Sequence, residues 1–280
     1  MMAGQNRQKA PFGVAAGIAL LALAGCAQPP KTDPLAQQRL ADQSVLALNW
    51  FQQSGEYQAL AHQAFNSAQR AFDAANTAPG RKKAVVVDLD ETMLDNSPYS
   101  GWQALQAKPF AGETWAKWSQ AEQAGAVPGA VQFARYVNGH QGTMFYVSNR
   151  KQSEYAATVA NMQKLGFTGM SEKTVLLSSD TSNKQARFDA IKRAGYDIVV
   201  YAGDNLNDFG AATYHKDNAQ RRAFVSQNQS KFGTEYILLP NPLYGDWESG
   251  MARDYNKLTP QQKLQIRQQA IKAWNGQGAR

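Results

Sequence analysis

The chain has 280 residues, of which 43% are apolar and 18% charged, and this is the balance of a globular protein with a buried core. Its formal net charge is +7, but the basic residues are dispersed and their longest run is Arg81-Lys82-Lys83. This pattern favours a basic surface that attracts small phosphorylated ligands over one that binds a nucleic-acid polymer. One cysteine excludes an internal disulfide framework and a cysteine-based zinc site.

Residues 1–25 have the layout of a secretory signal. Arg7 and Lys9 precede an apolar stretch, Phe12 to Ala24, that is too short for a stable membrane span. It ends in Leu23-Ala24-Gly25-Cys26, which resembles the bacterial lipobox, in which the cysteine is acylated and becomes the mature N-terminus. The alternative is a signal cut elsewhere, with an incidental cysteine.

Lipid on Cys26 would attach the chain to a membrane. Ala27 follows the cysteine, where an aspartate would favour the inner membrane, so we expect an outer-membrane lipoprotein of a Gram-negative bacterium, facing the periplasm or the surface. Residues 26–34 are rich in proline and are predicted to be a tether.

Residues 35–80 are predicted to form an N-terminal helical region. Its apolar side chains recur at spacings of three and four and make one stripe: Tyr57, Leu60, Ala64, Phe65, Ala68, Ala71 and Phe72.

From residue 81 to 250 short apolar runs alternate with helical patterns, which predicts an α/β fold around a mainly parallel sheet. The predicted strands are Ala84–Val87, Thr143–Val147, Thr174–Leu177, Ile198–Ala202 and Tyr236–Leu239. The predicted helices between them include Ser153–Leu165 and Gln185–Ala194. Ligands of such sheets bind beyond the carboxyl ends of the strands.

Two further segments are predicted to be helical. Residues 95–127 are too long for an ordinary loop and read as an inserted cap. In the tail, residues 251–280, the stretch Pro260–Trp274 has the pattern of an amphipathic helix, and packing on the protein is favoured over contact with lipid. With the N-terminal region, these segments would make a smaller helical domain.

Acidic residues follow the first and fourth predicted strands. Asp88 and Asp90 point to one side of the first strand end, and burying both charges requires an offsetting cation. A calcium-binding EF-hand is rejected, because its glycine and glutamate positions hold Met93 and Tyr99.

The order of several polar residues carries more information than any one of them. Asp88-x-Asp90-x-Thr92, then Ser148, then Lys184, then Gly203-Asp204-x-x-x-Asp208 resembles the haloacid dehalogenase superfamily, whose core is Rossmann-like. The longer strings, Val86 to Tyr99 and Gly203 to Phe209, resemble the two signatures of class C acid phosphatases, and most of all the lipoprotein e group of outer-membrane 5′-nucleotidases.

The resemblance implies one Mg²⁺ ion per chain and an aspartyl-phosphate intermediate. Asp88 would bind the metal and attack phosphorus. Asp90 would give the metal its backbone carbonyl and act as general acid and base through its side chain, with Thr92 fixing its position. Asp204 would bind the metal by a carboxylate, and Asp208 would hold a metal-bound water or orient Asp204.

The remaining roles concern the substrate. Ser148 and Lys184 would bind the phosphate oxygens, and Asn149 is an extra donor. By resemblance, Trp115 and Tyr244 would stack on a nucleobase, with core packing as the alternative for each. Trp118 and Trp247 are expected in the core.

The sequence therefore predicts a magnesium-dependent acid phosphatase and 5′-nucleotidase that acts on nucleoside monophosphates, nicotinamide mononucleotide among them. We expect an acidic optimum, because Asp90 must start protonated, and the resemblance suggests a homodimer. Alternatives are a phosphomonoesterase without nucleotide preference, a phosphomutase or phosphonatase, and a non-catalytic surface lipoprotein that binds haem or an adhesion partner.

Overall fold

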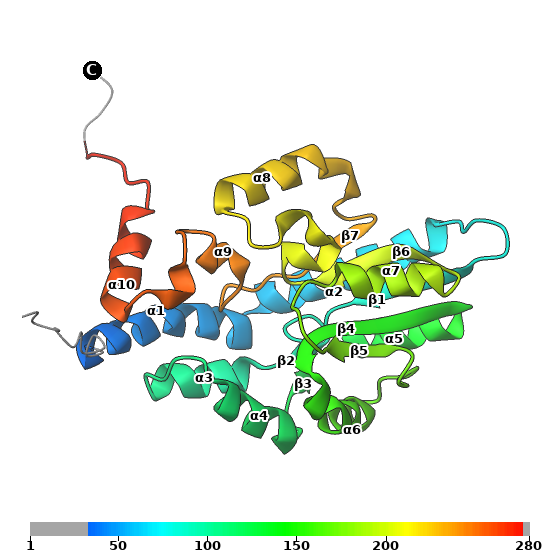
Figure 1. The fold of residues 1–280 in the computed structure, drawn as a ribbon, viewed down its shortest axis with the longest axis horizontal. Coiled ribbons are helices and arrows are strands. Elements are labelled where there is room, and N and C mark those ends of the chain that lie inside the picture. The colour runs from blue at the N-terminus through cyan, green and yellow to red at the C-terminus, as the bar shows by residue number, and fades with distance from the viewer. Residues whose placement is uncertain (1–32, 277–280) are drawn as a thin grey trace, which may run out of the picture. The chain divides into compact units, whose positions relative to one another are not determined.

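The predicted apolar runs form one parallel sheet in the computed structural model, which describes residues 33–276 (Figure 1). The signal segment and Cys26 lie outside the described residues. The strands are β1 (Lys82–Val87), β4 (Gly142–Lys151), β5 (Val175–Ser178), β6 (Tyr196–Gly203) and β7 (Tyr236–Leu238). Their order is β5-β4-β1-β6-β7, and each neighbouring pair is parallel. The α/β prediction is therefore confirmed, and β1 lies at the centre.

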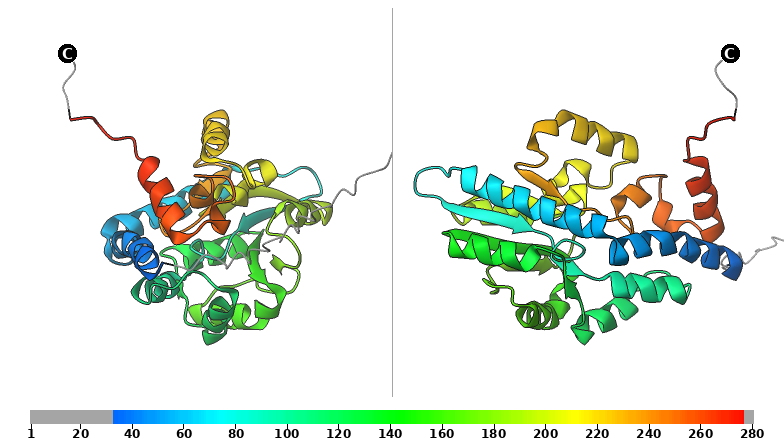
Figure 2. Two further views of the ribbon diagram at one scale, coloured as in Figure 1. Left: turned by 60° about the vertical axis from the view of Figure 1, so that its left-hand side comes forward. Right: turned by 180° about the vertical axis from the view of Figure 1, so that it is seen from behind.

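Both faces of the sheet are covered by helices, because successive side chains of a strand point to opposite faces. Val85 and Val87 pack into a core with residues of α2 (Gly55–Ala74), α5 (Ala130–Gly139) and α6 (Tyr155–Leu165). Ala84 and Val86 pack on the other face, against α7 (Gln185–Arg193) and α8 (Asn218–Gln227). The view from behind in Figure 2 shows α2 and α5 in front of the sheet.

The N-terminal region consists of two helices, α1 (Pro34–Gln53) and α2, separated at Ser54. The Ser54 hydroxyl accepts a hydrogen bond from the Tyr57 backbone N–H at 3.1 Å, which caps α2. The buried face of α2 contains Ala61, whereas Leu60 of the predicted stripe is 40% exposed. This face packs on α5 and β6, so α2 belongs to the core of the sheet.

The insert forms α3 (Ser97–Leu105) and α4 (Gly112–Ala121), and a two-stranded antiparallel sheet joins its ends. That sheet pairs β2 (Leu94–Asp95) with β3 (Gly125–Ala126). Helix α1 contacts both α3 and α10 (Pro260–Gln269), so segments far apart in the sequence make a helical part beside the sheet.

The C-terminal helix is shorter than predicted. It begins with a capping box between Thr259 and Gln262 but ends at Gln269, and none of its residues is fully buried. Beyond it, Ile271 is 70% exposed and Trp274 78% exposed. Most of the stability of a helix in a protein comes from burying an apolar face. The described residues after Gln269 bury no such face, so the helix is not extended through them. Within residues 33–276, no helix combines the length and the apolar character that a membrane span requires.

Candidate active site

Three aspartates from different parts of the sequence meet at the carboxyl end of the sheet. Asp88 follows β1, Asp204 follows β6, and Asp208 lies in the short 3-10 helix η2 (Leu206–Phe209). Each offers a carboxylate oxygen, and these oxygens all lie within 4.8 Å of one another. The predicted acidic cluster thus exists because β1 and β6 are neighbours in the sheet.

The sequence around Asp208 explains its position. The Asp208 carboxylate accepts a hydrogen bond from the Asn205 backbone N–H at 3.0 Å, within a capping box of η2. Gly203 makes this fold possible, because a Cβ atom there would lie 2.2 Å from Asp208 Oδ2. A glycine at the end of β6 therefore lets the chain turn back closely enough for Asp208 to face Asp88.

Lys184 partly balances this negative charge. It is the residue before α7, it is 3% exposed, and its Nζ lies 2.5 Å from Asp88 Oδ1 and 2.7 Å from Asp208 Oδ1. Burial by itself lowers the pKa of Lys184, but Asp208 and Asp88 raise the pKa above its ordinary value. The amine therefore stays protonated among the carboxylates.

Asp204 is held by two donors. Thr92 Oγ1 donates to its Oδ1 at 3.1 Å, and Asn241 Nδ2 donates to its Oδ2 at 2.8 Å. Thr92 was expected to help fix the position of Asp90, and its hydroxyl instead bonds Asp204. Each oxygen of Asp204 keeps a lone pair for another partner.

The carboxylate cluster carries more negative charge than Lys184 offsets. Burial raises the pKa of Asp88 well above its usual range, against the opposing effect of Lys184. Burial and then Asp208 raise the pKa of Asp204 to about 7. Buried oxygen donors of this kind fit a hard divalent cation, and Mg²⁺ commonly binds through a few carboxylates plus substrate phosphate. Asp88, Asp204 and Asp208 are the side chains that would hold it.

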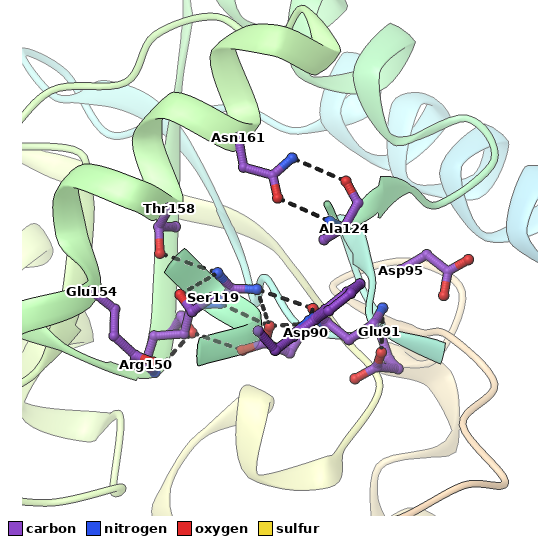
Figure 3. Close-up of polar contacts among 12 residues, drawn as sticks. Asp90, Glu91, Asp95, Ser119, Ala124, Arg150, Glu154, Thr158 and Asn161 are labelled. Carbon is purple, nitrogen blue, oxygen red and sulfur yellow. Dashed lines mark hydrogen bonds and ion pairs between the residues drawn. The ribbon is translucent and has the colours of Figure 1, made fainter. Parts of the chain in front are cut away.

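Asp90 lies beside this cluster, where it is held by Arg150 (Figure 3) and by Asn96. Arg150 Nε donates to Asp90 Oδ1 at 2.9 Å, and Arg150 Nη2 lies 2.8 Å from the same oxygen. Asn96 Nδ2 also donates to Oδ1, at 2.9 Å, while Ser148 Oγ donates to Oδ2 at 3.3 Å. Burial by itself lowers the pKa of Arg150, but the Asp90 charge raises it above its ordinary value.

A cavity of about 640 Å³ opens on these residues. The residues that line it include Asp88, Asp90, Asp204, Asp208, Asn149, Trp115 and Tyr244. Ser148 and Lys184 are buried beside it, where Ser148 contacts Asp90 and Lys184 contacts Asp88 and Asp208. Asn149 Oδ1 accepts from Arg187 Nη2 at 2.6 Å, which leaves its amide N–H groups as donors.

The two aromatic walls differ in their support. Trp115 makes an edge contact with Tyr99, with ring centroids 5.2 Å apart, and lies over the Arg150 guanidinium at 5.4 Å. Tyr244 is 39% exposed, and its hydroxyl donates to Glu91, which is fully buried and has a left-handed backbone at φ 56°. A left-handed glutamate beside Asp90 is strained, as backbone at functional sites often is.

Of the two tryptophans expected in the core, Trp118 packs against it and donates from Nε1 to Asn96 Oδ1 at 2.8 Å. The expectation for Trp247 is wrong, because Trp247 is 41% exposed.

The sequence reasoning missed several residues that hold the site: Glu91, Asn96, Arg150, Arg187 and Asn241. A signal for Arg150 was present. It is two residues after Ser148, and alternate residues of a strand share a face. The structure extends β4 through both residues to Lys151, beyond the predicted end at Val147. Asn241 gave no comparable signal, since it comes from a loop whose path depends on the tertiary fold.

Comparison with known proteins agrees with this geometry. The family model of the HAD superfamily, subfamily IIIB (acid phosphatase), matches residues 28–247. The class C acid phosphatase from Bacillus anthracis superposes with a TM-score of 0.80 at 34% identity, covering 85% of this chain and 100% of that one. The structure of that class C enzyme with tungstate bound gives a TM-score of 0.79 at 33% identity, with the same coverage.

A plant protein is related over a shorter range. Acid phosphatase 1 from Solanum lycopersicum is 27% identical over 129 residues, which are 44% of this chain and 50% of the plant protein. The match thus spans about half the length of that relative. Since the family model covers most of the chain, and the site has its acidic residues at the strand ends, the chain belongs to subfamily IIIB of the HAD superfamily, the acid phosphatases, a family of phosphoric monoester hydrolases.

Proposed function

We propose that this chain is a magnesium-dependent acid phosphatase that hydrolyses phosphomonoesters, nucleoside monophosphates in particular, through an aspartyl-phosphate on Asp88. The proposal is carried by the cluster of Asp88, Asp204 and Asp208, with Lys184 between Asp88 and Asp208 and with Asp90 lining the same cavity. A pure binding protein has no need of both a carboxylate cluster and a separately clamped carboxylate.

The chain's own residues account for the two half-reactions. An Asp88 oxygen bonds to phosphorus while the bond from phosphorus to the ester oxygen breaks, and Asp90 gives that leaving oxygen its proton. Asp90 then takes a proton from the water that attacks phosphorus and releases Asp88. Lys184 and the donors on Asp204 keep the carboxylates in place. Bound Mg²⁺ would offset the repulsion between the phosphate dianion and the aspartate.

Nucleotide preference is supported by the walls of the cavity. Trp115 and Tyr244 both line it, and stacking a base on an aromatic face contributes about 1–3 kcal/mol. A volume of about 640 Å³ lies within the range of small-molecule sites, about 300–1,000 Å³. Nicotinamide mononucleotide has the same plan of aromatic base, ribose and phosphate, so we include it among the substrates.

The mechanism is tested with a chromogenic ester. Wild type and Asp88→Asn are compared with p-nitrophenyl phosphate, each with Mg²⁺ and with a chelator. We expect hydrolysis only by the wild type with Mg²⁺. Equal rates for the two proteins would overturn the role of Asp88, and equal rates with and without the metal would overturn that of Mg²⁺.

The substrate class is tested separately. We expect Trp115→Ala and Tyr244→Ala each to lower kcat/KM for adenosine monophosphate and nicotinamide mononucleotide about 5–150-fold, which is the stacking energy expressed as a rate ratio. The kcat/KM for p-nitrophenyl phosphate should change less. Equal losses on every ester would mean that these rings only pack the cap.

For the location, we propose lipid attachment at Cys26 and residence in the outer membrane. The lipobox-like order Leu23-Ala24-Gly25-Cys26 supports this. Labelling of expressing Gram-negative cells with palmitate should mark the wild type and not Cys26→Ser. Labelled Cys26→Ser, or wild type that fractionates with the inner membrane, would contradict the proposal.

A further inference from the structure

We propose that Arg150 and Asn96 are positioning residues that hold Asp90 by its Oδ1 atom and thereby make Oδ2 the oxygen that transfers the proton. The proposal rests on the proposed phosphatase function and concerns how its acid–base group is aimed. It starts from the uneven partners of the two Asp90 oxygens.

Arg150 is a rigid support for Asp90. Its side chain is 1% exposed, and each of the three guanidinium nitrogens donates at least one hydrogen bond. Nη1 donates to Ser119 Oγ at 3.3 Å and to Thr158 Oγ1 at 3.1 Å, Nη2 donates to Asn96 Oδ1 at 3.1 Å, and Nε and Nη2 meet Asp90 Oδ1. Figure 3 shows the guanidinium between the helix that carries Thr158 and the loop that carries Asp90. Because the guanidinium is planar and hydrogen-bonded at each nitrogen, it fixes the orientation of Asp90 as well as offsetting its charge.

Asn96 can present only one group to Asp90. Its Oδ1 accepts from Trp118 Nε1 at 2.8 Å and from Arg150 Nη2 at 3.1 Å, and both of those atoms are donors only. The amide oxygen is therefore turned toward the donors, and Nδ2 must be the atom that meets Asp90 Oδ1 at 2.9 Å. The network orients the amide without any assumption about the substrate.

The two oxygens of Asp90 are consequently different. Oδ1 accepts hydrogen bonds from Arg150 Nε and Asn96 Nδ2 and lies 2.8 Å from Arg150 Nη2, so a proton on Oδ1 would point at donors. In the part of the chain that the structure describes, Oδ2 has one hydrogen-bond partner, Ser148 Oγ at 3.3 Å. A hydroxyl rotates and can donate or accept, so it tolerates Oδ2 with or without a proton. Ser148 therefore contacts Asp90 directly, at the oxygen that Arg150 does not hold.

As Asp88 bonds to phosphorus, the electron pair of the broken phosphorus–oxygen bond goes to the leaving oxygen, which takes the proton from Asp90 Oδ2. The resulting Asp90 carboxylate, held at Oδ1, later accepts a proton from the attacking water at Oδ2. A wrongly oriented Asp90 should therefore slow the hydrolysis of esters whose leaving group needs a proton. Esters whose leaving group departs as a stable anion should be affected far less.

The experiment compares two esters by kcat/KM, which covers only the steps up to departure of the leaving group. One ester is p-nitrophenyl phosphate, whose leaving group needs little protonation, and the other is an alkyl phosphate, whose alkoxide needs a full proton. For Arg150→Lys and Asn96→Ser we expect kcat/KM to fall about 10²–10⁴-fold on the alkyl ester, the usual worth of general acid catalysis. On p-nitrophenyl phosphate we expect a loss of less than about tenfold.

Controls separate aiming from general damage. Asp90→Asn should give the same selective pattern, and Arg221→Lys, which alters a buried arginine bonded to Asn205 and Asn207 rather than to Asp90, should affect both esters alike. If Asn96→Ser fails to fold, Arg150→Lys still tests the proposal, because it keeps the positive charge. Folded variants that lose equal activity on both esters, while Asp90→Asn is selective, would overturn the proposal.

A further readout is a burst. With p-nitrophenyl phosphate, Arg150→Lys should release about one p-nitrophenolate per site quickly and then turn over slowly, because hydrolysis of the aspartyl-phosphate also needs Asp90 Oδ2. A merely structural role of Arg150 would lower the burst and the steady rate together. Failure of the proposed function itself is distinguishable, because Asp88→Asn would then hydrolyse both esters as fast as the wild type.

Discussion

Gly203 allows a sharp test of how the acidic cluster is built. A Cβ atom at this position would lie 2.2 Å from Asp208 Oδ2, 2.3 Å from its Cβ and 2.4 Å from its Cγ. Because two of these atoms are close to the backbone, a rotamer change of Asp208 does not relieve the clash. In Gly203→Ala the η2 turn must move by about 1 Å or more, which disturbs the contacts of Asp208 with Lys184 and with the Asn205 N–H.

The cost has two parts. Overpacking of a close-packed site destabilises by about 1–3 kcal/mol, which for a chain of this size lowers Tm by about 2–12 °C. A displacement of about 1 Å in a catalytic constellation costs about 10²-fold in rate. We therefore expect Gly203→Ala to lower kcat for p-nitrophenyl phosphate about 100-fold and to lower Tm by several degrees.

The assay needs a control for the glycine-to-alanine change itself. Gly55 is the first residue of α2, and a Cβ atom there would have no neighbour within 4 Å. Gly55→Ala should keep full activity, with Tm unchanged or slightly raised because alanine favours helix. If Gly203→Ala matched Gly55→Ala in both Tm and kcat, the steric account of the Asp208 position would be refuted.

Further predictions concern the metal site and Tyr244. The pKa of Asp204, raised by burial and by Asp208 from an ordinary 3.8 to about 7, gives stability that is complete below about pH 4 and is lost as the pH rises through about 7. In chelator, Tm should thus fall between about pH 5 and pH 8, and added Mg²⁺ should raise it mainly at pH 8; a flat profile would contradict this. Thr92→Val removes the hydroxyl that donates to Asp204, so the half-saturating Mg²⁺ concentration should rise about 10–100-fold, whereas Thr92→Ser should stay near wild type. Tyr244→Phe removes the bond to Glu91 but keeps the ring, and its kcat/KM for nucleotides should fall about tenfold or less, short of the loss in Tyr244→Ala; equal losses would assign the effect to the hydroxyl.

The first-order plan of the molecule could be predicted from local pattern. Buried strands such as Ala84–Val87 are continuous apolar runs, and their alternation with helices predicts a parallel sheet that is covered by helices. Asp88 and Asp204 could be selected because each directly follows such a run, and strand ends are where ligands of these sheets bind. Each carboxylate is placed at a strand end by residues near it in sequence, and the two meet because β1 and β6 are neighbours in the sheet.

Element ends were less predictable. The Pro260–Trp274 pattern is apolar at helical spacing, yet α10 ends at Gln269, and the apolar residues Ile271 and Trp274 beyond it are largely exposed. Trp247 was expected in the core on its residue type alone, but it lies in the short helix α9 (Asp246–Ser249) at the surface. In both cases periodicity and residue type show which side chains a segment could bury. Whether those side chains are buried depends on which neighbouring segments pack over them.

The sequence by itself determined the carboxylates at the strand ends and the phosphatase family to which they point. Tertiary structure alone decided which groups hold those carboxylates. Thr92 and Asn241 reach Asp204, while Arg150 and Asn96 reach Asp90, across separations of 37 to 112 residues for Asp204 and 6 to 60 residues for Asp90. The reason is physical: a strand end is a local feature of the chain, whereas a hydrogen-bond partner is chosen by whichever side chain the packed helices and loops bring within about 3 Å.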